Sequence, residues 1–172
     1  MRKLNLPLNQ EELLSLKAGE EVLLNGVIYT ARDAAHKLLV ESIENGEELP
    51  FDLANSTIYY VGPTPTKKGS VIGSCGPTSS YRMDPYSDIL MDKGVKIMIG
   101  KGERSSKFQE SLVKHQAVYL SALGGLGALI NESIVKCELV AYEELGTEAI
   151  YKLTVKDFYA IVYYDTKGNI FK

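Results

Sequence analysis

The sequence predicts a mixed α/β fold in one domain, residues 1–172, and three observations support this. The length of 172 residues is that of a single domain. Hydrophobic residues make up 45% and charged residues 24% of the chain, as in an ordinary globular protein. Strand-like stretches alternate with helix-like stretches in the middle of the chain and cluster near its end, with no linker between them. This order favours a layered α/β domain.

The first regular elements are a strand and a helix within residues 21–46. β-branched and aliphatic residues predict a strand through Tyr29. A helix is expected next, with Thr30 as its N-cap and Asp33 completing an acidic capping box. Gly46 stands just after the expected end of this helix.

The remaining elements follow from the same periodicities. A turn near the end is expected at Lys167-Gly168 or Gly168-Asn169. Strands are expected in STIYYVGP (56–63), SVIGSCG (70–76), GVKIMIG (94–100) and AVYLS (117–121), helices near 86–92, in SSKFQESLVKHQ (105–116) and in GALINESI (127–134), and further strands from residue 136 onward.

Charge and cysteine content exclude several classes of function. The chain has 19 Lys and Arg against 22 Asp and Glu, so a nucleic-acid protein with a broad basic surface is not expected. No apolar stretch approaches the ~20 residues that span a bilayer, and the start does not resemble a secretory signal, so a cytoplasmic location without membrane contact is expected. Cys75 and Cys137 alone cannot hold a metal cluster, and we expect no metal site in this chain.

Polar residues follow three of the expected strands at small-residue turns. These residues are Thr30 to Arg32, Thr78 to Arg82, and Lys101. Ligands of α/β proteins bind beyond the carboxyl ends of strands, where helix N-termini also point. Arginine binds a carboxylate through two parallel hydrogen bonds, so Arg32 and Arg82 would suit a small dicarboxylate.

Other interpretations of these residues remain open. GPTSS can be a helix-capping turn with surface arginines beside it. Phosphate binding is disfavoured, because GSCGPTS lacks the Gly-Lys-Ser/Thr end of a P-loop. Cys75 could be a nucleophile with His36 or His115 as its base, or a packing residue. His36 follows Arg32 by one helical turn and could orient a neighbour.

Six motifs occur in order along almost the whole chain. They are YTARDAAH (29–36), YYVGPTP (59–65), GSCGPTSSYRMD (73–84), KIMIGKGE (96–103), AVYLSALGGLGAL (117–129) and LGTEAIYKLTVKDFYAIVYYDTKGN (145–169). Together they resemble the β subunit, or C-terminal domain, of class I fumarate hydratases and L-tartrate dehydratases. Ser79 and Tyr81 depart from the family pattern, which has threonine and glycine at these positions.

The resemblance implies a swivelling β/β/α fold and a hydro-lyase that reversibly hydrates fumarate to (S)-malate. It implies a four-iron four-sulfur cluster held by a partner α subunit, in a hetero-oligomer such as two α and two β subunits. Arg32, Thr78 and Arg82 would be catalytic, and Ser79 and Lys101 would join them in binding a C4 dicarboxylate, with Thr78 as the candidate proton acceptor. An L-tartrate dehydratase β subunit and a non-catalytic anion-binding domain are the alternatives.

Overall fold

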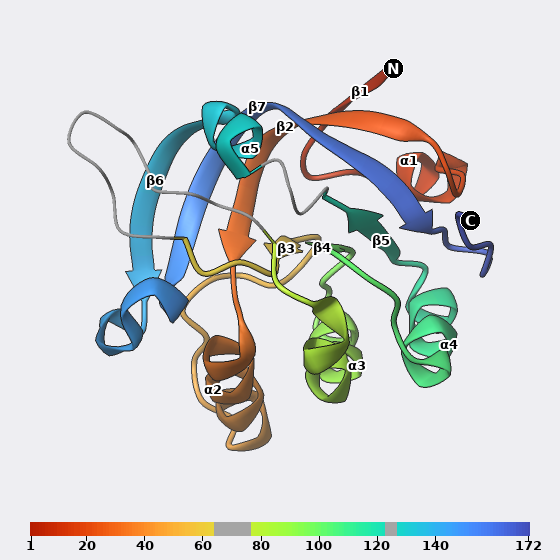
Figure 1. The fold of residues 1–172 in the computed structure, drawn as a ribbon. Coiled ribbons are helices and arrows are strands. Elements are labelled where there is room, and N and C mark those ends of the chain that lie inside the picture. The colour runs from red at the N-terminus through yellow and green to blue at the C-terminus, as the bar shows by residue number, and fades with distance from the viewer. Residues whose placement is uncertain (64–76, 123–126) are drawn as a thin grey trace.

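The described residues form a seven-stranded mixed sheet with the order β1-β2-β3-β4-β5-β7-β6 (Figure 1). The structure is a computed structural model that describes residues 1–63, 77–122 and 127–172. The strands are β1 (Arg2–Asn5), β2 (Glu21–Thr30), β3 (Thr57–Tyr59), β4 (Ile97–Gly100), β5 (Val118–Ser121), β6 (Ile134–Ala141) and β7 (Ile150–Tyr164). The helices are α1 (Gln10–Ser15), α2 (Asp33–Glu44), α3 (Asp84–Asp92), α4 (Ser106–His115) and α5 (Gly127–Glu132), with 3₁₀ segments η1 (Ser80–Met83) and η2 (Glu143–Glu148).

Five of the strands close into a barrel. Strands β2, β3, β4 and β5 are parallel neighbours, and the long strand β7 pairs antiparallel with both β5 and β2. Strand β1 extends the sheet beside β2, and β6 extends it beside β7. The structure is therefore a mixed α/β domain with a closed five-stranded barrel and two additional strands.

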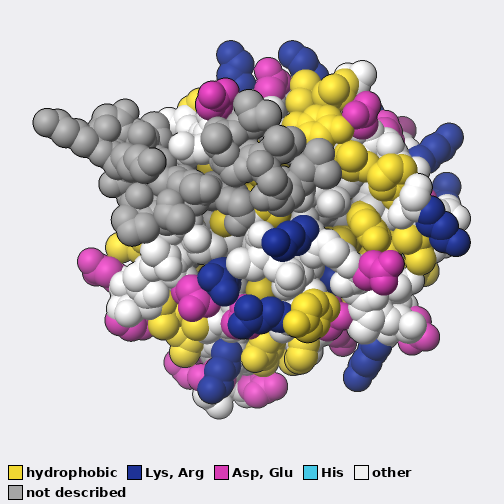
Figure 2. Space-filling view, viewed as in Figure 1, with side chains coloured by type: hydrophobic (Ala, Val, Ile, Leu, Met, Phe, Trp, Pro, Cys, Tyr) yellow, Lys and Arg dark blue, Asp and Glu magenta, His cyan; other side chains and the backbone are white. Residues whose placement is uncertain are grey.

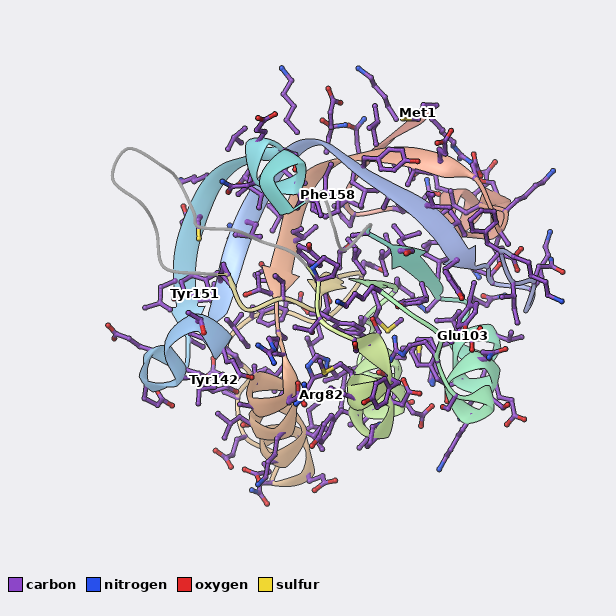
Figure 3. The ribbon with its side chains drawn as sticks, in the orientation of Figure 1. Met1, Arg82, Glu103, Tyr142, Tyr151 and Phe158 are labelled. Atoms are coloured by element: carbon purple, nitrogen blue, oxygen red, sulfur yellow. The ribbon has the colours of Figure 1, made fainter. Side chains whose placement is uncertain are left out.

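The short parallel strands β3, β4 and β5 bury both of their faces, and the two faces belong to two hydrophobic cores. In β3, Tyr59 belongs to the barrel core and contacts Phe158 of β7 edge to face, with ring centroids 5.3 Å apart (Figure 3). Its neighbours Ile58 and Tyr60 belong to a second core together with residues of α2, α3 and α4. These three helices lie side by side below the strands in Figure 1. Alternate residues of a strand point to opposite faces, so a single short strand supplies both cores.

The expected N-cap at Thr30 is wrong. Thr30 is the last residue of β2, where its hydroxyl accepts a hydrogen bond from the Tyr151 N–H at 3.0 Å and donates to the Ala149 carbonyl at 3.3 Å. The pairing with β7 therefore keeps Thr30 in the sheet. Arg32 occupies the N-cap position instead and makes no side-chain cap there, so the capping box with Asp33 does not form.

Most other sequence expectations agree with the structure. Helix α2 ends before Gly46, which has a φ of +67°, and the last turn contains Gly168 with a φ of +87°. Helix α3 begins at Asp84, two residues earlier than expected. The strand expected at 70–76 lies outside the described residues. Among the helices that the structure describes, none is long and apolar enough to cross a membrane.

Candidate functional site

The carboxyl ends of β2, β3 and β4 lie next to one another because these three strands are parallel neighbours. The segment that enters η1 runs across two of these ends. The Thr78 N–H donates to the Tyr60 carbonyl at 2.9 Å, just after β3. Ser79 forms an isolated parallel bridge with Lys101, just after β4. Thr78, Ser79 and Lys101 therefore meet at one edge of the sheet, as the sequence predicted.

Two arginines complete this edge from the side of β2. Arg82 Nε lies 2.9 Å from a carboxylate oxygen of Asp33, the first residue of α2. Arg32 directly precedes Asp33, and Figure 3 shows Arg82 on the side of the sheet where the helices lie. All five predicted residues thus lie along the carboxyl ends of three adjacent strands. We call Arg32, Thr78, Ser79, Arg82 and Lys101 the strand-end site.

The arginines of the strand-end site keep part of their hydrogen-bonding capacity free. Arg82 has 47% of its side chain exposed, and its Nε is paired with Asp33. Arg32 is 25% exposed, and its Nε has no hydrogen-bond partner, since the Glu148 carboxylate lies 3.8 Å away. A guanidinium group has five N–H donors, so both side chains retain donors for an anion.

Gly62 allows Arg32 to lie close to the end of β3. A Cβ atom at this position would lie 2.9 Å from Arg32 Cδ and 3.0 Å from the Thr147 carbonyl oxygen. Both contacts are tight, and a side chain at this position would push Arg32 or the Thr147 backbone away. The glycine of the YYVGPTP motif therefore favours this placement of Arg32.

Lys101 presents the third positive charge of the site. The residue is exposed, and among the described residues no carboxylate lies within 4.0 Å of its ammonium group. Several basic side chains gather near the centre of the face shown in Figure 2. Arg32 and Arg82 each face a carboxylate, Glu148 and Asp33, whereas Lys101 has none in the described part of the chain, so the edge keeps a net positive charge that would attract a small anion.

The Thr78 hydroxyl donates to the Tyr60 carbonyl oxygen at 3.1 Å and is partly buried. This bond orients the hydroxyl and leaves its oxygen lone pairs available. An amide carbonyl is not basic enough to take the hydroxyl proton. A role for Thr78 in proton transfer would therefore require another proton acceptor.

The two histidines lie in different environments. His36 is buried in α2, and its Nδ1 lies 2.8 Å from the Arg32 carbonyl oxygen, which accepts only, so Nδ1 carries the proton. Burial lowers the pKa of His36 from 6.5 to about 4, so the ring is neutral at pH 7. It thus holds the backbone of Arg32, in line with the interpretation that it orients a neighbour. His115 ends α4 and contacts Asp88.

Cys75 lies outside the described residues, so its proposed role as a nucleophile or a packing residue stays a prediction.

Arg104 is the main residue near the site that the sequence did not reveal. Its side chain is fully buried and forms an ion pair with Asp84 at the start of α3. It also donates to Ser87 Oγ at 3.0 Å and to the Tyr60 hydroxyl at 3.2 Å, and its guanidinium carbon lies 3.5 Å from the Phe108 ring centroid. From its sequence, the short GERSS segment (102–106) would be expected to form an exposed loop. No local pattern distinguishes Arg104 from an arginine on the surface.

Metal-ligating side chains do not cluster in the described ranges. No group of three or more His, Cys, Asp and Glu residues there could hold a metal ion. Cys137 lies half-buried in β6, where burial raises its thiol pKa. The described residues therefore do not offer a ligand set for a cluster.

The fold and the strand-end site together define an α/β barrel domain with cationic and hydroxyl side chains at the carboxyl ends of its strands. The family described as Fumarase C-terminus matches residues 1–172, and the chain belongs to this family. The chain is 41% identical over 172 residues to the aerobic class I fumarate hydratase of Escherichia coli K12, covering 98% of this chain and 31% of that protein.

Two further relatives differ in how much of their length is matched. Fumarate hydratase 2 of Leishmania major is 40% identical over 162 residues, covering 93% of this chain and 28% of that protein. The putative L(+)-tartrate dehydratase subunit beta of Methanocaldococcus jannaschii is 38% identical over 168 residues, covering 94% of this chain and 86% of that protein. The chain thus spans less than a third of the fumarate hydratases it matches, and most of the subunit.

Proposed function

We propose that this chain is the β subunit of an iron-sulfur hydro-lyase that interconverts fumarate and (S)-malate. In this proposal residues 1–172 form one domain of the swivelling β/β/α type. The domain supplies cationic and hydroxyl groups to a substrate site that it shares with a cluster-bearing α subunit. The single observation that carries the proposal is that Arg32, Arg82 and Lys101 come from three separate segments to adjacent strand ends beside Thr78.

The charges of the strand-end site fit the reaction. Removing a proton from the carbon next to a carboxylate creates a doubly charged species. Cations fixed in place before the reaction stabilise that charge as it develops. Arg32 and Arg82 would bind carboxylates through their free N–H donors, and Lys101 would add a compact positive charge.

Thr78 and Ser79 would place hydroxyls against the substrate. The Thr78 hydroxyl is oriented by its bond to the Tyr60 carbonyl, and it could take a proton from the substrate carbon only while it passes its own hydroxyl proton to a base. Neutral His36 already contacts the Arg32 backbone. We therefore expect the group that finally takes the proton to come from the partner subunit.

In this proposal the cluster resides in the partner, and the finding that the described residues bring together no set of metal ligands is consistent with that placement. When it is bound there, it supplies a Lewis-acidic iron for the departing hydroxyl group. The role of this chain is then to bind the dicarboxylate, to orient it and to hold positive charge beside it. A hetero-oligomer in the cytoplasm is the assembly we expect.

Tartrate dehydration is the second candidate, supported by one specific observation. One relative, of which this chain covers 86%, is named as a putative L(+)-tartrate dehydratase subunit beta. Tartrate carries a hydroxyl on both central carbons, so the same cations could bind its two carboxylates. A non-catalytic anion-binding domain is the remaining alternative.

The experiment is anaerobic co-purification of this chain with the α chain, followed by assays on malate, fumarate and tartrate. We expect a stable complex with a cluster and hydro-lyase activity, and neither cluster nor activity for this chain alone. The substrate with the highest catalytic efficiency decides between fumarate and tartrate. A complex without activity on all three, or activity of the isolated chain, would refute the proposal.

A further inference from the structure

Ser80 lies directly behind the strand-end site and is fully buried. Its N–H donates to the Lys101 carbonyl at 3.0 Å, and its Oγ accepts from the Lys101 N–H at 2.8 Å. Ser80 therefore binds both backbone groups of Lys101. A Cβ atom at Gly100 would collide with Ser80 Oγ, so the glycine before Lys101 allows this close contact.

The contact continues through a second buried hydroxyl. The Tyr119 hydroxyl oxygen lies 2.7 Å from Ser80 Oγ and 2.9 Å from the carbonyl oxygen of Gly102. A hydroxyl can donate and accept at once. The Lys101 N–H, the two hydroxyls and the Gly102 carbonyl thus form one hydrogen-bonded chain around the backbone that carries Lys101. Burial raises the pKa of Tyr119, which keeps its hydroxyl protonated.

This arrangement fixes the backbone of Lys101 and leaves its side chain exposed. Lysine is long and flexible, so the place its ammonium group can reach depends on where its backbone is held. Two hydrogen bonds from Ser80 and the bridge to Ser79 determine that position. The main-chain atoms of Ser80 and Lys101 also connect the η1 segment, which carries Thr78 and Arg82, to the end of β4.

We propose that Ser80, supported by Tyr119, is a positioning residue that holds Lys101 in its catalytic place. This inference rests on the proposed function, because it takes Lys101 to contact the substrate. Ser80 itself is buried behind the site and acts only through the lysine. Loss of its Oγ should therefore harm catalysis only while Lys101 is present.

The test is a double-mutant cycle in the assembled α and β complex, with Ser80→Ala, Lys101→Met and the double variant. A displacement of about 1 Å can cost roughly a hundredfold in rate. We expect Ser80→Ala to lower kcat/KM by about ten- to a hundredfold in the wild-type background and by less than about twofold in the Lys101→Met background. Equal losses in both backgrounds would overturn the proposal, because a general structural role would be additive. Wild-type efficiency of Ser80→Ala or of Lys101→Met would overturn it as well.

Two further variants separate positioning from folding. Ser87 is also buried, and its hydroxyl donates to the Met83 carbonyl and accepts from Arg104. Ser87→Ala should lower the melting temperature about as much as Ser80→Ala, but leave kcat/KM within about twofold of wild type. Tyr119→Phe keeps the ring in place and removes the second hydroxyl, so we expect a smaller loss than for Ser80→Ala.

A readout that does not depend on turnover keeps this inference distinct from the proposed function. Amide hydrogen exchange of the peptide around Lys101 should become faster in Ser80→Ala and stay unchanged in Ser87→Ala. Failure of the wild-type complex to act on any C4 hydroxy diacid would refute the proposed function. Unchanged exchange in Ser80→Ala would refute the positioning contact, whatever the activity.

Discussion

Arg104 and the cations of the strand-end site lie at the same end of the sheet but differ in how they are bound. The Arg104 side chain is buried and pairs with Asp84, Ser87 and Tyr60. Arg32 and Arg82 are 25% and 47% exposed and make few contacts with the described protein groups. All three arginines thus face a carboxylate, but Arg104 is enclosed by its partners, whereas Arg32 and Arg82 are partly exposed and keep donors that these contacts do not use.

The difference teaches how an arginine of the scaffold can be told from one that serves a ligand. A buried guanidinium must be paired within the protein, since an unpaired buried charge is very costly. A cation that serves a ligand must keep donors available until the ligand arrives. Contacts with its own chain, rather than sequence position, therefore distinguish the two groups.

The largest effect on stability is expected for Arg104→Met. This change leaves the Asp84 carboxylate, 14% exposed, without its partner and removes donors from Ser87 and Tyr60. Breaking a buried pair in this way costs about 3–5 kcal/mol of unfolding free energy, measured by urea denaturation. Lys3→Met, which removes an exposed ion pair with Asp157, is the control and should cost less than about 1 kcal/mol. If Arg104→Met lowered the unfolding free energy as little as the control does, Arg104 would not be a scaffold residue, and its contrast with Arg32 and Arg82 would be wrong.

The next effect concerns activity rather than stability. Arg82→Lys keeps the charge but loses the two-pronged geometry, and Arg82→Met loses both. Losing one charge-assisted contact in a closed site costs about 2–4 kcal/mol, so we expect a thirty- to thousandfold lower kcat/KM in the assembled complex. The ion pair with Asp33 is well exposed, so thermal melts should change little. Near wild-type activity, or a melting temperature low enough to explain the loss, would make Arg82 a scaffold residue.

A smaller effect is expected from His36 as the pH is lowered. In the unfolded chain this ring takes up a proton near pH 6.5, whereas in the fold burial delays protonation to about pH 4. Protonation therefore favours unfolding, and stability that is present above pH 6.5 is lost as the pH falls toward 4. At 1.36 kcal/mol per pH unit the loss is about 3 kcal/mol. His36→Gln should lose less over this range in urea titrations, and an equal loss would contradict the buried neutral ring.

The sequence predicted much of the fold because β3, β4 and β5 bury both faces and therefore lie in continuous apolar runs. The strands that contain Ile97 and Val118 and the helix that contains Phe108 occur where expected. Closure of the barrel could not be predicted, because it depends on β7 pairing with β2 more than a hundred residues away. The same pairing holds Thr30 in the sheet, which is why the expected N-cap failed.

The sequence predicted which residues come together in the strand-end site, but it did not predict which side chains they contact. Arg32, Thr78 and Lys101 each follow a glycine-rich or short turn, and parallel neighbouring strands place such residues together. The pair of Arg82 with Asp33 and the role of Ser80 depend on side-chain contacts between distant segments. Their roles toward a substrate remain predictions.

The most direct test of the shared substrate site is one kinetic assay of five variants in the assembled complex. Arg32→Met, Thr78→Val, Arg82→Met and Lys101→Met change the site, and Lys3→Met is the control on an exposed ion pair. We predict that each of the four site variants lowers kcat/KM for the preferred C4 substrate by about thirtyfold or more. The control should stay within about twofold of wild type, and the melting temperatures should change by only a few degrees. Wild-type efficiency in two or more of the four site variants would contradict a substrate site at the carboxyl ends of β2, β3 and β4.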